Sequence, residues 1–468
     1  MLRQLQIQNF KGWEDTGTIG MSEITLFFGA NSSGKSSIGQ FLMMLKQTVE
    51  SSDRKAVFFP GSINSPVQLG SFREMVYRRD LRSRISFKYN WKLPSPLKFK
   101  DVLSGKTYAT QRINFAATVG MEDDHSKLLC VEKLKYSLPL RGKPDLSVGM
   151  EKSEGKKHQY RVDSEQYSLK RNPGRVWQPG APIQFYGFPD EVVAYYQNAE
   201  FVKQLNLQNE NLFKRIFYLG PLRSKTDRLY PWSGITPESV GYSGENTVAA
   251  ILASRGRKIS LGYKKVTRPL EQLVAESLQR MGLIESFEVK PISKQRQEYE
   301  VKVRTKGSND WVDLPDVGFG ISQVLPVLVQ CFYAPSGSII LMEQPEIHLH
   351  PNAQSALADV MIDVINSREN GEDRNIQLII ETHSEHFLRR LQRRIAEDVI
   401  PKEKVSAYFA NIAKTPATLE SLKIDVFGNI LNWPENFFGD EMEDITKQAK
   451  AAILKRRKTS TVKPEASE

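Results

Sequence analysis

The sequence predicts an α/β fold built on a parallel sheet, and three segments carry this prediction. In the first, the apolar run from Ile24 to Phe28 enters GANSSGKS and continues into a segment with helical apolar spacing. In the other two, IILMEQPE and IIETHS, a short apolar run leads to acidic and polar residues and then to helical spacing. Apolar strands that alternate with helices are typical of parallel sheets, in which functional residues follow the carboxyl ends of the strands.

Composition and charge narrow the functional classes. The chain has 468 residues, of which 40% are hydrophobic and 25% charged, as in ordinary globular proteins. A formal net charge of +11 favours a polyanionic partner such as DNA, although a solvated basic surface explains it equally well. Cys130 and Cys331 lack metal-ligand spacing, which favours a reducing compartment. No stretch is apolar enough to span a membrane and the start has no signal core, so we expect a cytoplasmic protein with no membrane partner.

The segment GANSSGKSS has the spacing of a phosphate-binding loop. Its glycines let backbone amides curl around a phosphate, and the helix that follows points its positive end at the same place. In this motif Lys35 reaches the outer phosphates, and the hydroxyl of Ser36 is a ligand of Mg²⁺. The candidate nucleotide-binding residues are Gly29, Ala30, Asn31, Ser32, Ser33, Gly34, Lys35, Ser36 and Ser37. The alternative is a Ser/Gly turn that only caps a helix.

The segment IILMEQPEIHLHP is the candidate source of the acid that holds the Mg²⁺ of such a loop. Glu343 ends the apolar run and Pro345 stops it, after which helical spacing returns. The position after Glu343 usually carries a second carboxylate, but here it is Gln344. The segment IIETHSEHFL repeats the arrangement and places Glu381 and His383 at a strand end. Polar residues at several strand ends indicate the crevice of a parallel sheet.

A further helix start, VGFGISQVLP, precedes Glu343 in the sequence. Its candidate phosphate-binding residues are Gly318, Gly320, Ser322 and Gln323. A GxG before a helix is, by itself, more often a simple cap or a tight packing contact. Its place in the order of motifs is what favours a functional interpretation.

The segments GANSSGKSS, VGFGISQVLP, LMEQPEIHLHP and IIETHSEHFLRRL occur in this order in compact ABC-type ATPases. The chain resembles those related to the OLD and RecF proteins, a group that includes ATPase subunits of antiphage systems such as PtuA of the Septu system. FYLGPLRSKTDRLYPWSG, with Arg223, and IDVFGNILNWPENFFGDEM, which is similar to a small carboxy-terminal domain of unknown function, extend the resemblance. It implies an ABC-type head that binds ATP and Mg²⁺, forms homo-oligomers head to head and controls a separately encoded nuclease effector.

The resemblance also implies roles for single residues. Glu343 would support the Mg²⁺, and His383 would be the switch histidine that touches the γ-phosphate. Gln68 would sense the Mg²⁺ and the attacking water, although a single glutamine is more often only a surface residue. Lys11 would lie near the α-phosphate or the base, although a surface lysine explains it equally well. His350 would lie in the loop that faces the partner subunit, and the Gly318 to Gln323 loop would complete the site of that subunit.

Gln344 departs from the family pattern, because most of these ATPases have a glutamate there that polarises the attacking water. A neutral amide orients water but does not accept its proton, and general-base catalysis contributes roughly 10²- to 10⁴-fold to a rate. We therefore expect tight binding and slow turnover, with Glu343 or Glu346 as alternative bases.

Two other functions remain open from the sequence. The residues His348, His350, His383 and His386 cluster with Glu343, Glu346 and Glu381, which would suit a metal-dependent nuclease. A RecF-like ATPase that repairs or binds DNA directly is the second alternative. A transporter ATPase is a more distant one, because the predicted β insertion does not suit that compact module.

The predicted fold class is thus an ABC-type P-loop ATPase head with an inserted antiparallel β subdomain, a helical region and a small carboxy-terminal α+β domain. The expected boundaries are 1–82 and 286–405 for the two halves of the head, 83–190 for the β insertion, 191–285 for the helical region, 406–445 for the small domain and 446–468 for a basic tail. Alternating apolar residues predict the β insertion, and the absence of sustained heptads excludes long coiled-coil arms.

Overall fold

The computed structural model describes residues 1–122, 128–153, 159–174, 179–293, 296–305, 307–411, 416–434 and 446–453. Parts of the predicted small carboxy-terminal domain and of the predicted basic tail therefore lie outside the described residues. In the part of the chain that is described, no helix is long and apolar enough to cross a membrane.

A central sheet carries the ends of the three apolar segments that predicted the fold. Its strands, in spatial order, are β10 (Ile216–Leu219), β17 (Ile339–Glu343), β20 (Gln377–Glu381), β4 (Ile24–Gly29), β21 (Val405–Asn411) and β22 (Thr418–Ser421). Neighbouring strands from β10 to β21 are parallel, and β22 is antiparallel to β21. The α/β class with a P-loop head is confirmed.

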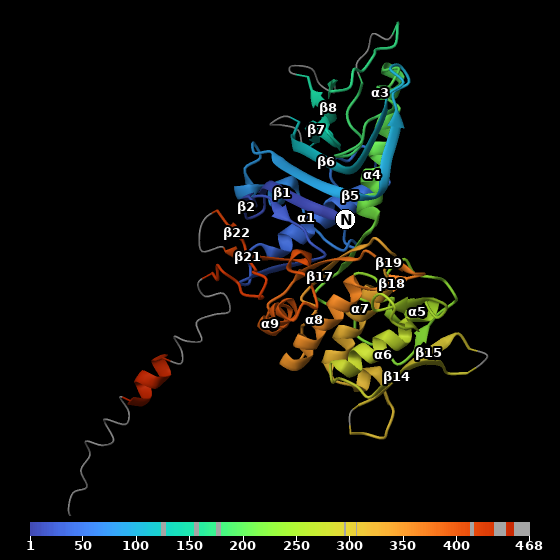
Figure 1. Ribbon diagram of the computed structural model, residues 1–468, viewed down its shortest axis with the longest axis vertical. Coiled ribbons are helices and arrows are strands. Elements are labelled where there is room, and N and C mark those ends of the chain that lie inside the picture. Colours follow the sequence, from blue (N-terminus) through green and yellow to red (C-terminus); the bar gives the residue numbers. More distant parts are fainter. Residues whose placement is uncertain are drawn as a thin grey trace, which may run out of the picture.

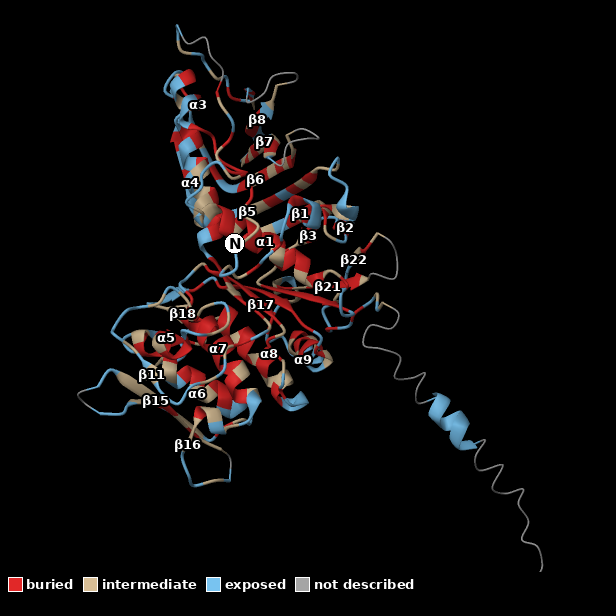
Figure 2. Ribbon diagram, turned by 180° about the vertical axis from the view of Figure 1, so that it is seen from behind, coloured by how far each residue is buried: buried red, intermediate tan, exposed pale blue. Residues whose placement is uncertain are grey.

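Alternating residues of the central strands belong to two different cores. Leu341 of β17 packs into the core shared with α1 (Lys35–Glu50), whereas its neighbours Ile340 and Met342 pack into the core on the other face. Because both faces are covered, the strands are apolar throughout, as buried parallel strands are. Figure 2 shows the buried residues along β17 and along the helices below it.

An antiparallel sheet covers α1 on the side away from the central sheet (Figure 1). Its strand order is β2 (Trp13–Asp15), β1 (Leu2–Phe10), β5 (Ile85–Lys100), β6 (Thr107–Met121), β7 (Leu129–Leu140), β8 (Lys143–Lys152) and β9 (Tyr160–Glu165), and β3 (Ile19–Gly20) pairs with β1. The predicted β insertion is therefore continuous with the first strands of the chain, since β1 pairs with β5. The inner face is rich in aromatic residues, among them Phe87, Tyr89 and Phe115.

The remaining elements flank the two sheets. The other helices are α2 (Phe72–Met75), α3 (Asp190–Tyr195), α4 (Phe201–Lys214), α5 (Thr247–Ala253), α6 (Leu270–Arg280), α7 (Phe319–Tyr333), α8 (Pro351–Ile365) and α9 (Glu385–Ala396), with short 3₁₀ turns at Tyr77–Arg79, Leu314–Asp316 and Lys402–Lys404. One small sheet has β11 (Tyr230–Pro231), β15 (Glu298–Arg304), β14 (Ser286–Pro291) and β16 (Val312–Asp313). Another has β13 (Thr267–Pro269), β12 (Lys258–Ser260), β18 (Arg368–Glu369) and β19 (Glu372–Asp373).

Two of the predicted domains contain strands that belong to the central sheet of the head. The segment predicted to be helical contains β10, whose residue Ile216 pairs with Ile339 in the central sheet. Strand β21, expected in the small carboxy-terminal domain, pairs with β4 in the same sheet. Both strands are short, and their membership of the sheet depends on pairing with residues far away in the sequence. The division into domains therefore remains a proposal.

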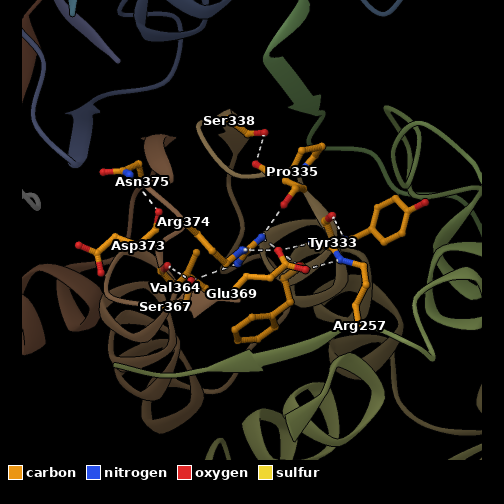
Figure 3. A network of polar contacts seen from close by, with 12 residues as sticks. Arg257, Tyr333, Pro335, Ser338, Val364, Ser367, Glu369, Asp373, Arg374 and Asn375 are labelled. Carbon is orange, nitrogen blue, oxygen red and sulfur yellow. Dashed lines mark hydrogen bonds and ion pairs between the residues drawn. The ribbon is translucent and has the colours of Figure 1, made fainter. Parts of the chain in front are cut away.

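Two arginines hold the carboxyl end of α7 (Figure 3). The fully buried guanidinium of Arg374 donates to the carbonyl oxygens of Cys331 and Phe332 at 3.3 and 3.0 Å, and Arg257 donates to that of Tyr333 at 2.6 Å. Glu369 accepts two hydrogen bonds from Arg257, at 2.8 and 2.9 Å. Cations satisfy the free carbonyls at the end of a helix and interact favourably with its dipole. This network fixes α7, whose other end carries the predicted signature residues.

Candidate nucleotide site

The loop between β4 and α1 is shaped by two glycines. Gly29 has a φ of 145°, and a Cβ there would lie 2.4 Å from the carbonyl oxygen of Ala410, so no larger residue fits. Gly34 has a φ of 88° and precedes the first turn of α1, which contains no acidic residue and no side-chain cap. The first amides of a helix have no intrahelical partner. This amino terminus is therefore open to an anion.

Trp13 supports the loop from the antiparallel sheet, a contact that the sequence did not reveal. Its indole Nε1 donates to the hydroxyl of Ser37 at 2.8 Å, and its ring faces the α-carbon of Gly34. A Cβ at Gly34 would lie 3.2 Å from the ring. The aromatic residue thus fixes the beginning of α1 relative to the antiparallel sheet.

Lys35 is buried inside the loop. Its ammonium group donates to the carbonyl oxygens of Gly29 and Ala30 at 3.0 and 2.8 Å and lies 4.0 Å from Oε1 of Glu381. Burial lowers the pKa of Lys35, and the charge of Glu381 opposes this shift. A buried ammonium that is held mainly by neutral carbonyl oxygens is poorly neutralised.

Two carboxylates lie side by side at the edge of the central sheet. Glu343 and Glu381 end β17 and β20 and are paired in register on adjacent parallel strands. Burial raises the pKa of Glu343 to about 7, with a further contribution from Glu381. Burial also raises the pKa of Glu381, although Ser36 donates a 3.0 Å hydrogen bond to its Oε1. The other oxygen, Oε2, is buried and has no hydrogen-bond partner among the described residues.

Tyr218 and Arg223 position Glu343. The phenol of Tyr218 donates to Oε1 of Glu343 at 2.8 Å. The buried guanidinium of Arg223 donates to the backbone carbonyls of Glu343 and Gln344 at 3.0 and 3.2 Å, and burial lowers its pKa to about 10. The sequence marked Arg223 only as part of a similar segment, and it gave Tyr218 no role. Their contacts depend on the parallel pairing of β10 with β17, which local sequence does not show.

Gln344 lies in a strained backbone conformation, with a φ of 45°. A positive φ is uncommon for residues other than glycine and tends to persist where the surroundings enforce it. Here the backbone amide of Gln344 donates to the backbone carbonyl of Glu381 at 2.8 Å, and Arg223 donates to the backbone carbonyl of Gln344. The loop after Glu343 is therefore tied to β20 as well as to β10.

Glu346 joins this loop to the segment of His383. Its Oε1 accepts a 2.8 Å hydrogen bond from the backbone amide of His383. Burial raises the pKa of Glu346, and partial burial together with Lys35 lowers the pKa of His383. The imidazole thus lies within electrostatic reach of the P-loop lysine, and its neutral form is favoured.

The signature residues begin a helix at the surface. Gly318 precedes α7, whose first turn has no acidic residue and no side-chain cap. A Cβ at Gly320 would lie 3.1 Å from the carbonyl oxygen of His348, so this helix end packs against the loop after Glu343. The hydroxyl of Ser322 is buried and donates within its own helix, to Phe319 O at 2.9 Å. Gln323 is half-buried.

Three other predicted residues have more local contacts. Gln68 is exposed, and its side-chain amide donates to the backbone carbonyl of Ile63 at 2.9 Å, within the same loop. His350 caps α8, because its Nδ1 accepts a 3.4 Å hydrogen bond from the amide of Asn352. Lys11 donates to the side chain of Gln40 on α1, and burial lowers its pKa while Glu343 opposes the shift. Lys11 is therefore the member of this group with an electrostatic link to the acidic edge.

The oxygen donors at this edge fit a hard divalent cation. The hydroxyl of Ser36, the carboxylate of Glu343 and the unpartnered oxygen of Glu381 are of the kind that Mg²⁺ prefers when it also keeps phosphate and water ligands. Transition metals would require more protein ligands. Within the described ranges, no group of three or more His, Cys, Asp or Glu is placed to hold a metal ion, so the histidine cluster expected for a nuclease is not assembled there.

The strand order, the loop between β4 and α1 and the acid at the end of β17 fit one class of protein, a nucleotide-binding P-loop ATPase. The chain belongs to the AAA ATPase domain family, which matches residues 1–113 and 257–388, more than half of its length. Residues 400–448 match a second family, described as a protein of unknown function (DUF3696). No curated protein matches the chain.

Solved structures give a distant likeness. The SMC head domain from Thermotoga maritima is 10% identical, with a TM-score of 0.38, and the match covers 90% of this chain and 99% of that one. An SmcHead bound to the C-winged helix domain of ScpA is 11% identical, with a TM-score of 0.41 and coverage of 90% and 98%. An Smc head domain with an extended coiled coil, bound to the C-terminal domain of ScpA derived from Pyrococcus furiosus, is 10% identical, with a TM-score of 0.38 and coverage of 96% and 99%.

Proposed function

We propose that this chain binds ATP with Mg²⁺ at the loop between β4 and α1, hydrolyses it slowly and uses the bound state to control a partner protein. One observation carries the proposal. An open helix amino terminus, the buried ammonium of Lys35 and the poorly neutralised carboxylates of Glu343 and Glu381 converge at one edge of the sheet. Such a site requires an anion and a cation together, and a nucleotide with its Mg²⁺ supplies both.

Each residue of the loop then has a definite task. The amides of residues 30–37 would bind phosphate oxygens, and Lys35 would exchange the carbonyls of Gly29 and Ala30 for them. Ser36 and Glu343 would hold the Mg²⁺, which when bound neutralises charge on the phosphates. His383, neutral beside Lys35, would donate to the outer phosphate.

Slow turnover follows from the groups available to accept a proton. Gln344 has no basic oxygen, and its backbone is fixed by Arg223 and Glu381. Glu343 is engaged by Tyr218, and one oxygen of Glu346 is engaged by the amide of His383. We expect a turnover below about 1 s⁻¹, at the low end for enzymes.

The surface around Gly318 supports assembly of two heads. Phe319, next to the open end of α7, is 76% exposed, and its ring lies beside that of His348, with the centroids 6.3 Å apart. The end of α7 and the loop after Glu343 therefore form one surface, which a second head would cover when nucleotide is bound. By the resemblance to OLD-related and Septu ATPases, the controlled partner is a nuclease effector in antiphage defence.

The rival function, direct binding of DNA, has weaker support in the charges of α9. Arg390 and Arg394 pair with Asp359 of α8, at 2.5 and 2.7 Å. Arg389 pairs with Glu385 of the same helix, and Arg393 pairs with Glu397, which directly follows the helix. The basic residues of α9 are thus largely neutralised by their neighbours, whereas binding to phosphates depends on free positive charge.

Nucleotide affinity tests the proposal directly. A fluorescent ATP analogue with Mg²⁺ should bind the wild type, and Lys35→Ala should weaken binding by at least about 2 kcal/mol, roughly 30-fold, because a charge-assisted contact to phosphate is lost. Lys46→Ala is the matched control, since Lys46 lies on the same helix and pairs with Glu50.

Equal affinity of wild type and Lys35→Ala would overturn the nucleotide site. Co-purification with a nuclease encoded next to this chain would support the proposed partner. Salt-dependent binding of bare DNA by the isolated chain would instead favour the RecF-like function.

A further inference from the structure

Glu381 occupies the position between the phosphate loop and Glu343. Its strand, β20, lies between β4 and β17, so that Glu381 is in register with Phe27 on one side and with Glu343 on the other. The side chains of these residues point to the same face, toward α1. The acid thus lies at the centre of the edge at which the nucleotide site is proposed.

The contacts of Glu381 reach the two side chains of the loop that act on phosphate and metal. Ser36 donates to its Oε1 at 3.0 Å, and the Nζ of Lys35 is 4.0 Å from the same atom. Glu381 is 9% exposed, yet its Oε2 has no hydrogen-bond partner in the part of the chain that the structure describes. A buried carboxylate oxygen without a donor is costly, so it requires a ligand from outside the chain.

The balance of charge at this edge favours a cation as that ligand. Glu343, Glu346 and Glu381 are all buried, and a second unpartnered carboxylate oxygen belongs to Glu346. Lys35 is shared with two backbone carbonyls, and Arg223 donates to backbone carbonyls of the loop. The acids outnumber the cations that contact their carboxylates, and a divalent cation would correct the imbalance.

We propose that Glu381 is a second protein carboxylate of the divalent-cation site, acting with Ser36 and Glu343 through its unpartnered oxygen. This inference rests on the proposed nucleotide site and specifies its cation-binding residues. A site with two carboxylates holds Mg²⁺ more tightly than a site with one. It would retain the nucleotide for longer, which suits a switch.

The test uses Glu381→Gln in the full chain, because glutamine still accepts the hydrogen bond from Ser36 but has no charge. The readout is binding of Mn²⁺, as a paramagnetic substitute for Mg²⁺, to the complex with an ADP analogue, followed from the signal of free Mn²⁺. We expect the Kd for Mn²⁺ to rise by at least about 10-fold, because the loss of a charged ligand should cost no less than the 10- to 100-fold found for residues that only support metal ligands. The affinity for the metal-free analogue should stay equal or increase, because a carboxylate near the phosphates has lost its charge.

Glu385→Gln provides the control, since Glu385 is the same residue type four positions later and pairs with Arg389 at the surface of α9. Its Kd for Mn²⁺ should equal that of the wild type. An unchanged Kd for Mn²⁺ in Glu381→Gln would overturn the inference and leave Glu381 as a residue that only positions Ser36. Failure of the wild type to bind the nucleotide analogue would instead overturn the proposed function.

Discussion

The buried acid of the antiparallel sheet and the buried acids of the central sheet are held in opposite ways. Asp101 follows β5, and its carboxylate accepts hydrogen bonds from Asn198, Tyr167 and the amides of Leu103 and Ser104. Burial acts to raise its pKa, but these hydrogen bonds lower it to about 2. The chain itself therefore stabilises the charge of Asp101.

At the carboxyl edge of the central sheet the chain supplies fewer donors, since Glu343 accepts from Tyr218 and Glu381 from Ser36. Burial raises the pKa of Glu343 to about 7, and one oxygen of Glu381 has no partner among the described residues. Unsatisfied groups destabilise a folded protein and are expected to be retained where they serve a function. Asp101 thus stabilises the fold, and the contrast supports the proposal that Glu343 and Glu381 hold a ligand.

Gln344→Glu would test this contrast most strongly, because it adds a further carboxylate to the acidic edge. If a missing base limits hydrolysis, steady-state phosphate release should increase by roughly 10²-fold. Without metal, the midpoint of thermal unfolding should fall, since a further negative charge is added beside the buried carboxylates of Glu343 and Glu381.

Gln344→Ala is the control for that substitution, because it removes the amide without adding a base and should not increase the rate. An unchanged or slower rate in Gln344→Glu would mean that the water is activated by another residue. A raised unfolding midpoint without metal would contradict the view that this edge carries excess negative charge.

Asp101→Asn would test the other side of the comparison. In this variant an NH₂ group replaces Oδ2 of Asp101, the oxygen that accepts hydrogen bonds from Ser104. We expect the free energy of unfolding in urea to fall by about 1.5–3 kcal/mol, the range for hydrogen bonds to charged groups. Asp145→Asn, at an exposed position of β8, should change it by less than about 0.5 kcal/mol. Equal effects of the two substitutions would show that Asp101 has no special structural role.

Much of the central sheet could be predicted because its strands are continuous apolar runs that end in glycine, proline or acidic residues. The same runs placed Glu343 and the loop around Lys35 in one site. The role proposed for Glu381 could not be predicted in this way. It depends on β20 lying between β4 and β17 and on the register that pairs Glu343 with Glu381. Strand order and register are set by long-range packing, which the local pattern does not contain.

The pairing within the antiparallel sheet could not be predicted from local sequence either. Alternating apolar residues predicted its strands, but pairing of β1 with β5 joins the start of the chain to that sheet. Trp13 reaches the phosphate loop for this reason. Trp13 of β2 and Ser37 of α1 therefore form one supporting contact, although they belong to different predicted elements.

The smallest predicted effect concerns the pH dependence of stability without metal. The folded pKa of Glu343, about 7, exceeds its ordinary value of 4.5, so between these values the folded state holds a proton that the unfolded state has released. The contribution of protonated Glu343 to the stability of the folded state is fully present below pH 4.5 and is lost as the pH rises through 7. Asp101 acts in the opposite sense, since its contribution is present above pH 3.8 and is lost as the pH falls through 2.

Urea unfolding with a chelator at pH 5 and pH 8 isolates the contribution of Glu343. In Glu343→Gln the loss of stability between the two pH values should be smaller than in the wild type by on the order of 1 kcal/mol. Asp101→Asn should leave the loss unchanged, because Asp101 is ionised in both states over this range. If the wild type and Glu343→Gln lose the same free energy of unfolding between pH 5 and pH 8, the chain itself already neutralises Glu343. Glu343 would then not differ from Asp101 in this respect.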